Sequence, residues 1–89
     1  MRAVVSVIGK DMVGILAKVS GVCCEYNVNV IDVTQTVLQD VFAMTMLVDV
    51  SACTVGFADF SGKMNELGES IGLSIRVMHE DIFNSMHRI

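Results

Sequence analysis

The chain has 89 residues, a formal net charge of −4, 53% hydrophobic residues and 18% charged residues. This apolar fraction excludes a disordered chain, and the length fits one small domain. No apolar run approaches the ~18 residues of a membrane-spanning helix, and an acidic chain has no electrostatic attraction to nucleic acid or to an anionic membrane. We therefore expect a folded domain that binds neither nucleic acid nor a membrane.

The cysteines and the first residues predict the compartment. Three cysteines, two of them adjacent, make a poor disulfide framework; they are Cys23, Cys24 and Cys53. A reducing environment is therefore expected. The apolar run over 2–8 is too short for a signal peptide, and no small-residue cleavage site follows it. Together these features predict a cytoplasmic protein.

The apolar pattern predicts one domain over residues 1–89. Alternating and β-branched runs indicate strands, whereas apolar residues at helical spacing indicate helices. Asp11 is the expected N-cap of the first helix, and Asn27 and Gly72 mark the ends of the first and second helices. The predicted elements are a strand over 2–8, a helix over 15–26, strands over 29–38 and 41–50 joined by a hairpin at 39–40, a helix over 57–71, a strand over 73–78 and a short helical tail.

This order is that of a ferredoxin-like βαββαβ sandwich, an α+β fold whose four-stranded antiparallel sheet carries both helices on one face. In the second strand, Ile31, Val33 and Val37 are expected to share a face. The other sheet face is expected to be bare in a monomer, yet the strand over 41–50 is apolar on both sides. This excess of apolar residues, together with an edge strand that begins at Asn29, predicts a homodimer. The tail over 80–89 is expected to dock on the partner subunit.

A resemblance to the ACT domain family covers nearly the whole chain. It rests on Asp11-Met12-Val13-Gly14-Ile15-Leu16-Ala17-Lys18-Val19-Ser20 and on Asn27-Val28-Asn29-Val30-Ile31-Asp32. The family pattern is Asp-x-Pro-Gly-Ile/Leu-Leu after the first strand, then a helix, then Asn-Ile at the start of the second strand. Val13 stands where the family often has proline, and it can adopt the same backbone angles. The ending over 79–89 resembles that of uncharacterised bacterial and archaeal proteins made of a single ACT domain.

ACT domains are small ligand-binding regulatory modules of amino-acid metabolism, so the resemblance implies an amino acid held between the first loop and the second strand of a neighbouring subunit. A helix N-terminus suits a carboxylate, and Asn29 offers both a donor and an acceptor. Gly14 serves either the approach of a ligand or close packing of the helix on a strand. The expected ligand-binding residues are Lys10, Asp11, Met12, Val13, Gly14, Ile15, Asn29, Val30 and Ile31.

Two functions follow from these observations. One is a homodimeric regulatory domain that binds a small molecule, most simply an amino acid, and acts on a regulated protein. The alternative is a ligand-free dimerisation or adaptor module that binds a partner protein. Neither an enzyme nor a cofactor is expected, because the chain has no acylphosphatase-like motif, phosphate-binding loop or Ser-His-Asp set. No metal is expected either, because nothing forces the metal-capable residues to converge; they are His79, Glu80, Asp81 and His87.

Overall fold

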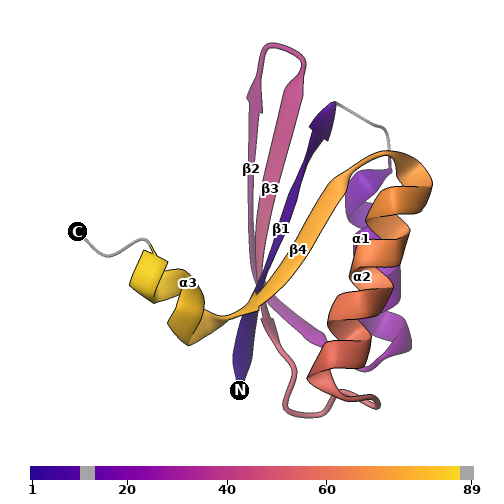
Figure 1. The fold of residues 1–89 in the computed structure, drawn as a ribbon, viewed down its shortest axis with the longest axis vertical. Coiled ribbons are helices and arrows are strands. Elements are labelled where there is room, and N and C mark those ends of the chain that lie inside the picture. The colour runs from indigo at the N-terminus through magenta and orange to yellow at the C-terminus, as the bar shows by residue number, and fades with distance from the viewer. Residues whose placement is uncertain (11–13, 87–89) are drawn as a thin grey trace.

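The elements of the chain follow the predicted order in a computed structural model, which describes residues 1–10 and 14–86. They are β1 (Arg2–Lys10), α1 (Ile15–Glu25), β2 (Asn29–Leu38), β3 (Val41–Asp49), α2 (Phe57–Ile71), β4 (Ser74–His79) and α3 (Glu80–Met86) (Figure 1). Both predicted helix ends are confirmed, because Asn27 and Gly72 take left-handed backbone conformations with φ of 59° and 76°. The hairpin turns at Gln39, whose φ is 56°.

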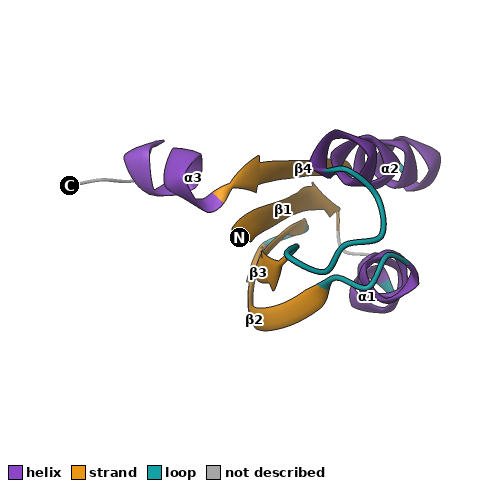
Figure 2. Ribbon diagram, turned by 90° about the horizontal axis from the view of Figure 1, so that it is seen from below, coloured by secondary structure: helices purple, strands orange, loops and turns teal. Residues whose placement is uncertain are grey.

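The four strands form one antiparallel sheet in the order β2-β3-β1-β4. Helices α1 and α2 cover one face, as predicted, and α3 lies away from them (Figure 2). Both β1 and β2 are antiparallel to β3, so they run in the same direction. The end of β1 and the start of β2 therefore lie at opposite ends of the sheet.

The core lies between the sheet and the two helices α1 and α2. Its largest fully buried side chains are Phe60, Met44, Met46 and Met64. Phe60 meets Tyr26 edge-on, with 6.4 Å between the ring centroids. Methionine is flexible enough to fill irregular gaps in such a core. The ring contact joins α2 to the end of α1 and so fixes the helix pair over the sheet.

The face assignment of β2 is wrong at Ile31. The pairing of β2 with β3 shifts register between Val30 and Asp32, which is the signature of a β-bulge. Val30 and Val33 pack against the core, whereas Ile31 is 46% exposed. The extra residue in the bulge moves Ile31 off the core face, so it becomes available for contacts outside the chain.

β1 also runs two residues further than the sequence indicated. Gly9 pairs with Phe42, and Lys10 pairs with Val41. A Cβ on Gly9 would collide with the side chain of Leu73. The glycine therefore makes room for a buried leucine and continues the strand, so the predicted end of this strand at residue 8 is wrong.

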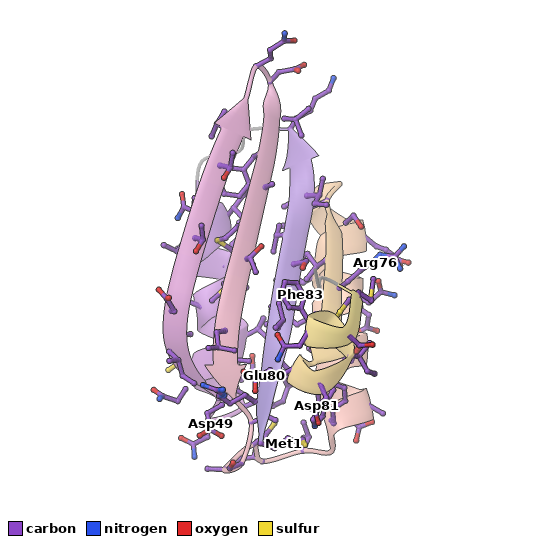
Figure 3. All side chains as sticks on the ribbon, turned by 90° about the vertical axis from the view of Figure 1, so that its left-hand side faces the viewer. Met1, Asp49, Arg76, Glu80, Asp81 and Phe83 are labelled. Carbon is purple, nitrogen blue, oxygen red and sulfur yellow. The ribbon has the colours of Figure 1, made fainter. Side chains whose placement is uncertain are left out.

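The face opposite α1 and α2 is partly covered, in contrast to the bare face expected of a monomer. α3 packs on β1 and β4, and its Glu80 carboxylate pairs with Arg2 at 2.8 Å. Val4, which alternates with the core residues of β1, is only 4% exposed. Figure 3 shows Phe83 on α3 lying over the sheet. Ile82 stays 56% exposed, and docking of the tail on a partner subunit remains a prediction.

Candidate functional site

Gly14 begins α1 and holds the first half of the predicted site. It is the N-cap residue, with φ 83° and ψ 9°, so the N-cap is not Asp11 as the sequence suggested. Its carbonyl accepts the first helical hydrogen bond, from the amide of Lys18 at 3.0 Å. A Cβ added to Gly14 would meet no described atom within 4 Å, so close packing does not explain this glycine. The positive φ explains it, because residues with a side chain are strained in that backbone conformation.

The start of α1 has the electrostatics of an anion site. Its first turn contains no acidic residue, so no side chain there offsets the partial positive charge of the helix N-terminus. Lys10 is exposed at the end of β1, four residues before Gly14. Ile15 is buried at 3% exposure, so it can serve a ligand through its main chain only. The predicted site residues Asp11, Met12 and Val13 lie outside the described residues.

The second half of the site surrounds Asn29. A surface hollow of about 440 Å³, within the ~300–1,000 Å³ of small-molecule pockets, lies between α1 and the start of β2. Asn29 is exposed and Val30 is half-buried. The residues around the hollow are Ser20, Cys23, Cys24, Asn27, Val28, Asn29, Val30 and Ala52. Of these residues, Asn29 and Val30 were predicted from the sequence to belong to the site, and the others were missed.

Hydrogen bonds fix the rim of this hollow. The side-chain amide of Asn27 donates to the carbonyl of Ala52 at 3.1 Å. The amide of Thr54 donates to the carbonyl of Tyr26 at 3.0 Å. These bonds tie the loop after β3 to the end of α1. The missed helix residues had a signal, because Ser20 and Cys24 are four apart and so share one side of α1.

The two halves do not meet within one chain. Lys10 is in register with Val41, whereas Asn29 is in register with Asp49, which pairs with Arg2. Eight residues of strand separate the two register positions, or ~26 Å at about 3.3 Å per residue. A ligand that contacts both Gly14 and Asn29 must therefore lie between two copies of the chain.

The cysteines of α1 differ in their surroundings. Burial, with a smaller effect of the nearby Cys53, raises the pKa of the Cys23 thiol from 9.0 to about 11. Cys24 is exposed on the rim of the hollow. The thiolate is the reactive form, and Cys23 is both protonated and covered at neutral pH.

Alkylation with iodoacetamide at pH 8 is therefore expected to modify Cys24 in the folded protein well before Cys23. Peptide mass spectrometry after timed quenching measures the two rates, and unfolding in urea should make them similar. Equal rates in the folded protein would contradict the burial of Cys23.

The remaining polar clusters offer no comparable site. His79 Nδ1 lies 3.6 Å from a carboxylate oxygen of Asp81, and His87 lies outside the described residues. Within residues 1–10 and 14–86, no three His, Cys, Asp or Glu side chains form a group suited to a metal. None of the described helices is long and apolar enough to cross a membrane.

Comparisons with known proteins agree with this fold. The ACT domain family model matches residues 2–78. The chain is 49% identical over 88 residues to the UPF0237 protein of Methanocaldococcus jannaschii, covering 99% of this chain and 98% of that protein. Among solved structures, an ACT domain protein from Streptococcus pneumoniae superposes with a TM-score of 0.81 and 34% identity, covering 93% of both chains. A formyltetrahydrofolate deformylase from Pseudomonas syringae matches at 0.78 and 20% identity over 88% of this chain and 27% of that chain, which shows the fold alone.

Proposed function

Because the chain belongs to the ACT domain family of ligand-binding regulatory domains, we propose that it binds a small amino acid, or a similar metabolite, as a homodimer that regulates another protein. The observation that carries this proposal is the separation of the two half-sites at opposite ends of one sheet. A second copy is the simplest way to join them. The proposed activity is binding, without catalysis.

The exposed edge of β2 supports a dimer of the required geometry. β2 is an edge strand. Large apolar side chains stay exposed on it and on the neighbouring side of α1: Leu16 is 39% exposed, Ile31 46% and Val37 55%. Pairing two copies through this edge would bury these side chains and satisfy the free backbone groups of the strand.

In the proposed dimer, the two β2 strands pair antiparallel about a two-fold axis. The start of one β2 then lies beside the end of the other. Leu38 at the end of β2 is in register with Val41, and Val41 is in register with Lys10. The partner's Asn29 therefore reaches the end of the sheet at which α1 begins. Each ligand lies between Gly14 of one subunit and the Asn29 hollow of the other.

The groups at such an interface match an amino acid. The backbone amides at the start of α1 suit its carboxylate. The Asn29 side chain can accept from its ammonium group and donate to its carboxylate. The hollow beside Asn29 leaves space for a side chain, and its rim is held by the Asn27 bond to Ala52.

Replacement of Asn29 by alanine is expected to abolish ligand binding while leaving the fold intact, because the side chain is exposed. A thermal-shift screen of the twenty common amino acids would first find the ligand. At ~100 times its dissociation constant, a ligand adds about 2.7 kcal/mol to stability, which raises the midpoint by more than about 8 °C in a domain of this size.

The control is Asn84→Ala, an equally small change on exposed α3. Loss of the shift in Asn29→Ala but not in Asn84→Ala supports the assignment. An unchanged shift in Asn29→Ala would remove Asn29 from the site. If no compound raised the unfolding midpoint, the second candidate function, a ligand-free adaptor, would be favoured. The exposed β2 edge would serve as the dimer surface in that case too.

The dimer itself gives a separate prediction. Sedimentation at micromolar concentration is expected to show twice the 9.7 kDa mass of one chain. Val37→Lys places a charge in the proposed interface and should yield monomers. Glu66→Lys, at an exposed position on α2 outside that interface, should leave the dimer intact. A wild-type protein that sediments only as a monomer would contradict the proposal.

A further inference from the structure

We propose that the groove between α2 and β4 binds an extended segment of another protein, and that this segment carries a carboxylate. The groove has a volume of about 780 Å³ and lies between the α2 residues Ala58, Ser61, Gly62 and Asn65 and residues 74–78 of β4. It lies along the sheet edge opposite to β2. This inference goes beyond the proposed function, because it assigns a surface through which such a module would act on a partner.

The backbone of β4 defines the kind of occupant. β4 pairs with β1 on one side only, and its other side has no neighbouring strand among the described residues. The unpaired N–H and C=O groups of an edge strand are satisfied by another extended backbone. On the opposite side of the groove, α2 presents the small residues Ala58, Ser61 and Gly62 between Phe57 and Asn65. An added strand therefore has space beside β4.

The charge of the groove defines the chemistry of the occupant. Among the described residues, Arg76 is the one charged residue that lines the groove, in a chain of net charge −4, and Figure 3 shows it projecting past the outer edge of β4. Neither of the two carboxylates that follow it in the chain pairs with it. Glu80 pairs with Arg2 at 2.8 Å, and the carboxylate of Asp81 lies 3.6 Å from His79 Nδ1. In the described part of the chain Arg76 has no ion pair, so a carboxylate on the occupant would complement it.

A second copy of this chain fits the groove poorly. Antiparallel pairing of two β4 strands would bring the two Arg76 side chains close together, which like charges oppose. Placing the β2 edge of one copy on the β4 edge of the next is a head-to-tail contact, which gives rings or open filaments and would use the β2 edge already assigned to the proposed dimer. A segment of a different protein avoids both problems.

Two short peptides test this surface on the ligand-free protein, so the outcome does not depend on whether an amino acid binds. The probes are acetylated, amidated heptapeptides, Thr-Val-Thr-Asp-Thr-Val-Thr and a twin with Asn in place of Asp. Amide chemical shifts of the isotope-labelled protein, followed up to millimolar peptide, are expected to change along 74–78 and 57–65. The Asp peptide should bind about three- to fivefold more tightly than its twin, the range of a partly exposed ion pair.

Three variants make the test specific. Gly62→Leu fills the groove, and Gly21→Leu is the matched control on α1. A Cβ at either position meets no atom of the described residues within 4 Å, so both should fold. Gly62→Leu should weaken binding at least about tenfold, Gly21→Leu should not, and Arg76→Gln should remove the preference for Asp. The proposal is overturned if shifts cluster along 29–38, if no shifts occur, if both leucine variants bind equally, or if Arg76→Gln keeps the preference.

Discussion

Replacement of Phe60 by alanine is expected to lower the free energy of unfolding by about 3–5 kcal/mol, the usual range for truncating a buried phenylalanine. Phe60 is completely buried and is the largest such side chain in the core. Its ring also meets Tyr26 edge-on at 6.4 Å, a geometry that adds to the energy of burial. The variant loses both the packing between α2 and the sheet and the contact with the end of α1.

Equilibrium urea unfolding at fixed protein concentration measures this loss. Domains of this length have about 4–13 kcal/mol of total stability, so the variant stays measurable or unfolds outright. Phe57→Ala is the matched control, because Phe57 is only half-buried at the start of α2. It should lose distinctly less. If Phe60→Ala proves unfolded, Phe60→Leu should give a smaller, measurable loss. Equal losses at Phe57 and Phe60 would contradict the core as described.

Two glycines of α2 are expected to respond to alanine in opposite directions. A Cβ on Gly68 would lie 2.8 Å from the backbone oxygen of Leu73 and 3.2 Å from the backbone nitrogen of Ile75. Backbone atoms of Leu73 and of β4 cannot move aside as a flexible side chain can, so Gly68→Ala should lose about 1–3 kcal/mol. Gly62 faces open space, and Gly62→Ala should gain up to ~1 kcal/mol from helix propensity.

The same urea titration, applied to both alanine variants, compares them directly. The opposite signs matter more than either magnitude, because both changes make the same chemical substitution in the same helix. If Gly68→Ala stabilised the protein, α2 would have to lie further from β4 than described. The groove between α2 and β4, proposed to hold a partner strand, would then be wider.

The order of elements was predictable because its signals are local. Periodicity changes between strands and helices, and Asn27 and Gly72 end helices through their own backbone preferences. The exposure of Ile31 was not predictable, because a bulge depends on how β2 pairs with β3. The extension of β1 through Gly9 depends equally on a distant residue, Leu73, which occupies the space left by the missing side chain.

The candidate site was only partly predictable for the same reason. Gly14 and Asn29 could be selected because each begins an element in a family pattern. Their separation along the sheet follows from the parallel course of β1 and β2, which local sequence does not specify. Ser20 and Cys24 join Asn29 only once α1 lies beside β2. The apolar character of the tail was visible, yet its position over β1 and β4 required the structure.

The central claim is that each ligand site is shared by two subunits, and a mixed dimer tests it most directly. Gly14→Val damages one half-site, and Asn29→Ala damages the other. The ligand is the amino acid that raises the unfolding midpoint of the wild-type protein most. Each variant alone should fail to bind it. Dimers containing one chain of each variant keep one undamaged Gly14 beside one undamaged Asn29.

We expect these mixed dimers, isolated with two different affinity tags, to bind the amino acid at half the wild-type stoichiometry with wild-type affinity in a calorimetric titration. Failure of mixing to restore binding, with both variants folded and dimeric, would place the site within a single subunit and contradict the account. If no amino acid raised the unfolding midpoint of the wild-type protein, the account would already be contradicted before mixed dimers were made.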